Sequence, residues 1–404
     1  MFNDHPIFVV MAVAVLAPLL AEIPIAVRAP VVVLEVVIGI LVGPHLLGLV
    51  DPKALGGLLY YLQIIGTAAV LFMAGMELDF NEIRGRPLSL ALVGWLASAV
   101  LALSAMALLH VIPDLRAPLM VTIALTTTSL GALIPILRDG GQLDSQFGRM
   151  LLGAGTVGEV APIVAVSLAL SDRYTTWQEF GFLIVFLALV GLAAIVGMGA
   201  RPPKALALLS RTMRASTQLP VRLALFLMAA FVVLATKLGF EGILGAFAAG
   251  MIVGLATRGQ AGEAFRAKID AVCFGFLTPF FFVGTGIAFD VTALTRDPTT
   301  MLLTPAFLLL FLVVRGVPVV FYRNDLPKPM RLPFALSSSV ASLGLVVVIT
   351  QIGLREKSMN VEIVHALVAA AMLSLLVYPT LAGALLPKAA PSKRNSAPPV
   401  MPGA

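Results

Sequence analysis

Long uncharged stretches of apolar residues recur along the whole chain, separated by short clusters of proline, glycine and charged residues. A helix needs about 17–25 mostly apolar residues to cross a membrane. By this criterion the pattern predicts thirteen membrane-spanning helices, the first of them short. Their expected ranges are 7–21, 29–47, 58–76, 88–112, 117–137, 148–171, 179–199, 220–236, 240–256, 270–288, 301–322, 331–352 and 361–386.

Composition agrees with this pattern. Of the 404 residues, 59% are hydrophobic and 12% are charged, whereas a soluble domain has about 25% charged residues. A soluble enzyme and an intrinsically disordered chain are both excluded on these grounds. A single cysteine, Cys273, allows no internal disulfide. We therefore expect an all-α, multi-pass membrane protein that is not an enzyme and that needs no cofactor and binds no nucleic acid.

The basic residues are distributed unequally between alternate loops. The loops that follow the odd-numbered spans, counted with the adjoining span ends and the C-terminal tail, hold nineteen Lys and Arg residues, against seven in the other set. Cytoplasmic loops of membrane proteins carry the excess of positive charge. The bias predicts that the N-terminus lies outside and the C-terminus in the cytoplasm, in a membrane that we expect to be the plasma membrane of a bacterium.

The two ends of the chain differ from the body. The N-terminal MFNDHPIF lacks the basic region of a signal peptide, so the first span is expected to be retained. Residues 387–404 are rich in Pro, Ala and Ser and are predicted to be a disordered cytoplasmic tail. Residues 1–386 are predicted to form one transmembrane domain.

The two halves of that domain resemble each other. LFMAGMELDF (71–80) matches FFFVGTGIAFD (280–290), TSLGALIPILRDG (128–140) matches ASLGLVVVITQIG (341–353), and Glu35 matches Glu241, at offsets of 209, 213 and 206 residues. Seven spans separate the copies, so the second copy must be inverted in the membrane. We expect repeats over 7–171 and 220–386, joined by a linker helix at 179–199. Inverted repeats are typical of secondary transporters.

Two charged residues are predicted to lie deep in the membrane. Glu159 is in the middle of span 148–171, and Arg315 is in span 301–322. An intramembrane charge is costly and therefore marks a candidate functional site. A carboxyl group shielded from water can exchange a proton for a cation, which is the chemistry of an antiporter. The alternative is a structural ion pair between the two residues.

Other polar positions are weaker candidates. Glu35 lies near a helix start and is a secondary candidate, with a helix-end role favoured. The charges at Glu77, Asp79 and Glu82 beside Arg84 and Arg86 are interpreted as an interfacial cluster. The histidines near helix ends are interpreted as structural: His45, His110 and His365.

Two polar runs interrupt apolar spans at matching positions of the two halves. The first is Thr126–Ser129, with Thr127, Thr128 and Ser129 as candidate ligands, and the second includes Ser338, Ser339 and Ser342. Ser and Thr can bond harmlessly to their own helix. Their symmetry favours the other interpretation, a pair of broken helices whose freed backbone groups and hydroxyls bind a cation.

The segments VLEVVIGILVGPHLLGLV, LFMAGMELDF, TTTSLGALIPILRDGGQLDSQFGRMLLGAGTVGEVAPI and FLTPFFFVGTGIAFDV resemble the monovalent cation:proton antiporter-2 family over essentially all thirteen spans. The resemblance implies inverted six-helix repeats with two discontinuous crossing helices. It also implies a core of spans 4–6 and 11–13, a dimerising panel from the rest, and a homodimer. By position, Glu159 matches the ion-binding aspartate of the family and Arg315 matches the basic residue of the eleventh helix.

The sequence departs from the family at Gly158, where the family has the first residue of an acidic or amide–acid pair. Without that carboxylate, we expect one-for-one electroneutral exchange. Some members carry a cytoplasmic nucleotide-binding domain, which is not expected here.

The resulting hypothesis is an antiporter that exchanges Na⁺ or K⁺ for H⁺ and serves pH homeostasis. Glu159 binds either ion, Thr127, Thr128 and Ser129 assist, and Arg315 stabilises Glu159 or the crossed helices. Two alternatives remain: a sodium-coupled symporter of organic solutes, and a membrane sensor or assembly protein that transports nothing.

Overall fold

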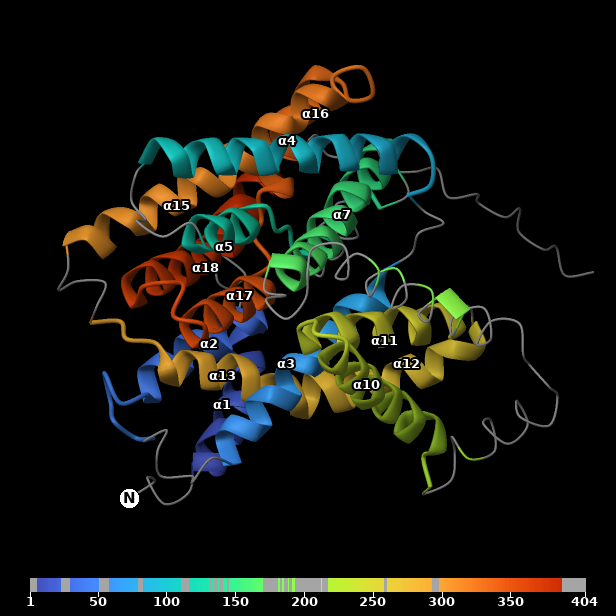
Figure 1. Ribbon diagram of the computed structural model, residues 1–404, viewed down its shortest axis with the longest axis vertical. Helices are drawn as coiled ribbons and strands as arrows, with labels where there is room; N and C mark the ends of the chain where they lie inside the picture. Colours follow the sequence, from blue (N-terminus) through green and yellow to red (C-terminus); the bar gives the residue numbers. More distant parts are fainter. Residues whose placement is uncertain are drawn as a thin grey trace, which may run out of the picture.

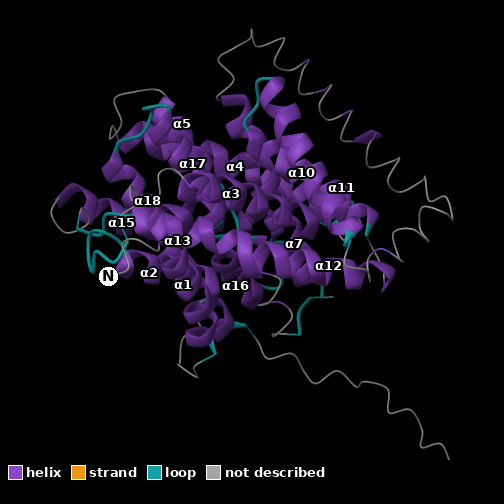
Figure 2. Ribbon diagram, turned by 90° about the horizontal axis from the view of Figure 1, so that it is seen from below, coloured by secondary structure: helices purple, strands orange, loops and turns teal. Residues whose placement is uncertain are grey.

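The computed structural model describes residues 6–22, 30–50, 58–78, 83–109, 116–130, 132–133, 137, 141–143, 145–169, 217–257, 260–292 and 298–386, with a few single positions between 181 and 212. Every regular element in these ranges is helical (Figure 2). The expected linker helix at 179–199 and the tail at 387–404 lie mostly or wholly outside the described residues. Each of the other twelve predicted spans contains a described helix.

Eight of the described helical segments are long and apolar enough to cross a membrane. Three shorter apolar helices accompany them: α1 (Pro6–Ala21), α2 (Val31–Val42) and α11 (Gly242–Ala256). By their length and composition, these helices are those of a multi-pass membrane protein.

The helices form two groups (Figure 1). The first, here called the panel group, contains α1, α2, α3 (Leu58–Glu77), α10 (Leu219–Lys237), α11, α12 (Gln260–Val272) and α13 (Thr278–Ala288). A short π-helix, Cys273–Leu277, joins α12 to α13. The second, the core group, contains α4 (Arg86–Leu109), α5 (Arg116–Leu125), α7 (Gln146–Ala169), α15 (Pro298–Gly316), α16 (Lys328–Ser338), α17 (Leu343–Arg355) and α18 (Val361–Leu385). A 3-10 turn, Val317–Tyr322, follows α15.

Glycines set the close packing within the panel group. A Cβ on Gly250 of α11 would collide with the backbone of Phe72 in α3, and one on Gly75 of α3 would collide with the backbone of Phe247 in α11. Membrane helices gain little from the hydrophobic effect and associate through such close backbone contacts between small residues.

The core group contains both interrupted helices that the polar runs predicted. The first break is at Thr126–Ser129, between α5 and the helical residue Leu130. The second is at Ser339–Ser342, between α16 and α17. The two breaks touch, because the Ser129 N–H donates to the Val340 carbonyl at 2.8 Å and the Thr128 hydroxyl donates to the Ser338 carbonyl at 2.7 Å. The prediction of two discontinuous crossing helices is confirmed.

Candidate functional site

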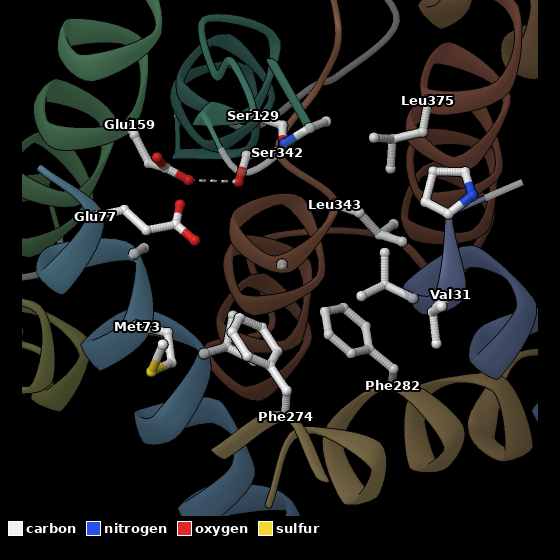
Figure 3. Close-up of a pocket in the computed structure, with 16 residues that line it drawn as sticks. Val31, Met73, Glu77, Ser129, Glu159, Phe274, Phe282, Ser342, Leu343 and Leu375 are labelled. Carbon is white, nitrogen blue, oxygen red and sulfur yellow. Dashed lines mark hydrogen bonds between the residues drawn. The ribbon is translucent and has the colours of Figure 1, made fainter. Parts of the chain in front are cut away.

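A cavity of about 260 Å³ lies between the two groups of helices. The core group contributes Glu159, Ser129, Ser342, Leu343 and Leu375 to its wall. The panel group contributes the residues from α2, α3, the π-helix and α13: Val31, Met73, Glu77, Phe274 and Phe282. Figure 3 shows the Glu159 and Glu77 carboxylates pointing toward each other across this space.

Glu159 is the most deeply buried carboxylate of the wall, with 5% of its side chain exposed. Its Oε1 accepts a 3.4 Å hydrogen bond from the Ser342 hydroxyl, at the start of α17. Its Oε2 is buried without any hydrogen-bond partner. A buried carboxylate oxygen without a donor is costly, so this group is suited to gaining a proton or a cation.

The break in the second crossing helix explains why the start of α17 faces Glu159. Stopping at Ser338 and resuming at Leu343 directs the first N–H groups of α17 into the interior. The N-terminus of a helix carries a partial positive charge that favours a nearby anion. The Leu130 backbone, where the first interrupted helix resumes, also faces the Glu159 carboxylate.

Glu77 is the functional candidate that the sequence interpretation missed. It was assigned to an interfacial charge cluster, but it is the last residue of α3 and lies in the cavity wall. No described residue forms a hydrogen bond or ion pair with its side chain. One signal distinguished it: Glu77 falls at the end of an apolar run, whereas Asp79 and Glu82 follow that run. Asp79 and Glu82 lie outside the described residues.

Arg315 is buried, with 5% exposed, but it forms no ion pair with Glu159. Its Nε donates to the Thr128 hydroxyl at 2.7 Å, its Nη1 to the Ser98 hydroxyl at 3.3 Å and its Nη2 to the Ala154 carbonyl at 3.0 Å. The structural ion pair considered from the sequence is therefore not formed. The guanidinium instead links α15 to the first break, α4 and α7.

Gly158 makes room for that guanidinium. A Cβ at this position would lie 2.7 Å from Arg315 Nη2 and 2.8 Å from the Thr128 hydroxyl oxygen. The position where the family has a side chain is thus occupied here by the side chain of Arg315. The placement of the Arg315 guanidinium therefore depends on the absence of a side chain at Gly158.

The remaining candidate residues divide into two sets. Ser129 and Ser342 line the cavity together with Glu159. The other four candidates do not line the cavity. Their hydroxyls donate hydrogen bonds to nearby carbonyls: Thr127 to Ala124 at 2.8 Å, Thr128 to Ser338 at 2.7 Å, Ser338 to Arg315 at 3.0 Å and Ser339 to Ala335 at 2.7 Å. Glu35 is buried on α2, with 3% exposed, and is not part of the wall.

The fold and the site describe one class of protein: an all-helical membrane transporter in which two crossed, broken helices face a buried carboxylate on a neighbouring helix. Residues 11–388 match the family described as "Sodium/hydrogen exchanger, transmembrane". The chain belongs to this family. Its architecture matches the sodium proton antiporter MjNhaP1 of Methanocaldococcus jannaschii with a TM-score of 0.62 at 15% identity, over 95% of this chain and 98% of the other.

Three relatives of this chain are named as antiporters. The chain is 25% identical to the putative Na⁺/H⁺ antiporter YjbQ of Bacillus subtilis over 92% of its own length and 61% of the relative. It is 25% identical to the Na⁺/H⁺-K⁺ antiporter GerN of Bacillus cereus, over 71% of this chain and 73% of GerN. It is 26% identical to cation/H⁺ antiporter 18 of Arabidopsis thaliana, over 70% of this chain but 37% of that protein. The chain thus spans slightly less than two thirds of YjbQ and little more than a third of the plant relative.

Proposed function

We propose that this protein exchanges a monovalent cation, Na⁺ or K⁺, for H⁺ across the membrane, with Glu159 as the group that binds either ion. The observation that carries the proposal is the buried Oε2 of Glu159, which faces the cavity without a hydrogen-bond partner. The relatives named as Na⁺/H⁺ and cation/H⁺ antiporters support the same activity.

The physical basis is the cost of an uncompensated charge away from water. An ionised carboxylate in a low-dielectric site is stable only when an opposite charge neutralises it, and otherwise it takes up a proton. A cation and a proton therefore compete for Glu159. Because the empty, charged site is unfavourable, the protein changes conformation with one ion or the other bound, which couples the two flows.

Glu77 supplies a second carboxylate from the other group of helices. A cation held between Glu159 on α7 and Glu77 on α3 would be bound by both groups at once. We propose that the Ser129 and Ser342 hydroxyls complete this site. Thr128 and Ser338 act indirectly in this proposal, by fixing Arg315, and Thr127 by fixing the first break.

Exchange is proposed to be one-for-one and electroneutral. Two carboxylates that share one site repel each other, so one of them holds a proton more firmly than the other. Only one proton then leaves when one cation enters. The test is the effect of a clamped membrane potential on exchange in proteoliposomes. A rate or end point that follows the potential would indicate that both carboxylates release protons.

Alternating access is proposed to arise from movement of the core group against the panel group. The cavity lies between these groups, so a relative displacement would open it to one side and then the other. We further propose that residues 1–386 form one transporting unit of two inverted repeats, that the N-terminus is outside and the C-terminus cytoplasmic, and that the panel group joins two copies into a homodimer.

The test is exchange in proteoliposomes with a preset pH gradient. Adding Na⁺ or K⁺ is expected to dissipate the gradient for the unaltered protein. Glu159→Gln keeps the volume but cannot carry a charge, so it is expected to reduce exchange to the background of empty liposomes. Glu77→Gln is expected to raise the cation concentration for half-maximal exchange at least about tenfold, equivalent to about 1.4 kcal/mol of lost binding.

Glu263→Gln, on the amphipathic helix α12 away from the cavity wall, is the matched control and is expected to exchange normally. Normal exchange by Glu159→Gln would contradict the site assignment. Repeating the assay with Li⁺, Na⁺, K⁺ and Rb⁺ determines the transported ion.

The same assay separates the other candidate functions. A cavity with two carboxylates disfavours an organic anion as the substrate. Uptake that requires Na⁺ without moving protons would support the symporter, and a protein that moves no ion would support the sensor or assembly role.

A further inference from the structure

Glu77 and Glu159 line the same cavity but belong to different groups of helices. Glu77 is the last residue of α3 in the panel group, whereas Glu159 lies in the middle of α7 in the core group. Their carboxylates point toward each other across the cavity (Figure 3). The two side chains are therefore neighbours only while the two groups of helices keep their present relation.

The proposed alternating access would separate these two carboxylates. Glu159 moves with the core group, whereas Glu77 stays with the panel group. A displacement that closes this cavity and opens the opposite side takes Glu159 away from Glu77 and toward the far end of the panel group. What the site contains in that second arrangement depends on the panel residues at the far end.

The internal repeat identifies the panel residue that matches Glu77. The segment 71–80, which includes the end of α3, matches 280–290 at an offset of 209 residues, and this offset pairs Glu77 with Gly286. Because the two copies are inverted, α3 ends at the cavity, whereas α13 leaves the cavity wall after Phe282 and ends on the opposite side. The far-end equivalent of Glu77 is thus a glycine.

The packing around Gly286 leaves no space for a carboxylate. A Cβ at this position would collide with the Val36 carbonyl oxygen, because α2 and α13 meet backbone to backbone here. On one side of Gly286 is Thr285, whose hydroxyl donates to the Phe281 carbonyl at 2.7 Å, and on the other is Ile287. None of these three neighbouring positions supplies a negative charge.

Among the described residues of the panel group, two carboxylates lie at the far end, and both are engaged. The Asp290 Oδ1 accepts hydrogen bonds from the Thr292 N–H at 2.9 Å and hydroxyl at 2.6 Å, and it lies 3.4 Å from His45 Nδ1. Glu241, at the start of α11, forms an ion pair with Arg355, with 2.6 Å between Oε1 and Nη2. The carboxylate at the end of α3 has no such partner among the described residues.

We propose that Glu77 is a one-sided cation ligand, which joins Glu159 while the site is open to the cavity and is left behind when the site opens to the opposite side. This inference rests on the antiport and the alternating access of the proposed function. The cation meets two carboxyl groups on the first side and one on the second, so it binds more tightly from the cavity side. In the proposed orientation this is the cytoplasmic side, which suits the protein to collecting a dilute cation from the cytoplasm and releasing it outside.

Such sidedness leaves the end point of exchange unchanged, because the ion gradients fix that end point. It changes the cation concentration at which each face of the protein works. By linkage, a bound cation also favours the cavity-open arrangement by the same factor as the difference in affinity.

The test compares the two faces of the membrane in one assay. Everted and right-side-out vesicles that contain the full chain and a trapped pH indicator are prepared with equal pH on both sides, and Na⁺ or K⁺ is added outside at increasing concentration. The half-maximal concentration then refers to the cytoplasmic face in everted vesicles and to the outer face in right-side-out vesicles. It is expected to be at least about tenfold lower in everted vesicles.

Glu77→Ala removes both carboxylate oxygens from the panel side of the site. This variant is expected to raise the half-maximal concentration at least about tenfold in everted vesicles and to leave the right-side-out value within about twofold of the parent. A general structural defect would alter both faces alike, so a one-sided change identifies a ligand. Glu263→Ala, on α12 away from the cavity wall, is the matched control and is expected to keep the parent's difference between the faces.

Equal half-maximal concentrations at the two faces of the parent would overturn the inference, and so would a Glu77→Ala change of the same size at both faces. A change confined to right-side-out vesicles would support the one-sided ligand and reverse the proposed orientation. If the parent exchanges ions from neither face, the proposed function itself is contradicted, and this inference with it.

Discussion

At the scale of single residues, the site depends on which side chains are absent as much as on which are present. The missing side chain at Gly158 lets the Arg315 guanidinium lie against α7 and donate to the Ala154 carbonyl at 3.0 Å. Arg315 is thus satisfied by neutral acceptors and leaves the Glu159 carboxylate unpaired. A carboxylate already paired with a guanidinium would have less affinity for a proton or a cation.

Gly158→Ala is therefore expected to lower both stability and exchange. The new methyl group would displace Arg315 or Thr128, and overpacking of this kind costs about 1–3 kcal/mol. The measurements are the thermal midpoint of the purified protein and the exchange rate in proteoliposomes. Gly383→Ala, on α18 with open space around the new Cβ, is the control. Equal midpoints and rates for the two variants would show that Arg315 does not depend on Gly158.

The contrast between Glu159 and Glu77 shows how far the sequence predicts the site. Glu159 could be found from the sequence because a charge in the middle of an apolar span is exceptional. Glu77 lies at a span end beside other charges, where a charged residue is ordinary, and only the packing of α3 against the core group brings it into the cavity. The bonding of Arg315 to Thr128, rather than to Glu159, likewise depends on contacts between residues 187 positions apart.

At the scale of elements, the two groups of helices are built differently. The core group is organised around interrupted helices whose backbone groups face the site, whereas α3 and α11 of the panel group meet backbone to backbone through glycines. Close packing makes the panel group a firm surface, and in the proposed alternating access the core group moves against this surface.

Gly250→Ala is expected to destabilise the panel group, since its methyl group would strike the Phe72 backbone, which cannot swing aside as a side chain can. The expected cost is about 1–3 kcal/mol, seen as a lower thermal midpoint. Gly94→Ala on α4, where the new Cβ would lie 3.6 Å from the Tyr322 ring, is expected to be neutral. Equal midpoints for these two variants would mean that α3 and α11 readily move apart.

At the scale of the whole molecule, the distribution of charge between the loops is the basis of the proposed direction of insertion. The loop between α10 and α11 belongs to the set with few basic residues, and the segment before α16 belongs to the basic set. Under this assignment the ends of α2 and α3 that line the cavity face the cytoplasm.

The orientation predicts opposite labelling of two exposed lysine positions. In a Cys273→Ala background, a membrane-impermeant maleimide applied to intact cells is expected to label Lys237→Cys and not Lys328→Cys. Everted vesicles are expected to give the reverse. Labelling of Lys328→Cys in intact cells would invert the proposed topology, and with it the side assigned to the cavity.

The sequence by itself determined the all-helical membrane architecture, twelve spans that contain described helices, the two broken helices and the choice of Glu159 as the candidate site residue. Each of these follows from local chemistry: a segment enters the membrane according to its own polarity, and a charge within it stands out against its neighbours. The tertiary structure alone decided that Glu77 faces Glu159 and that Arg315 occupies the space beside Gly158. These contacts join residues far apart in the chain, and their formation depends on how whole helices pack.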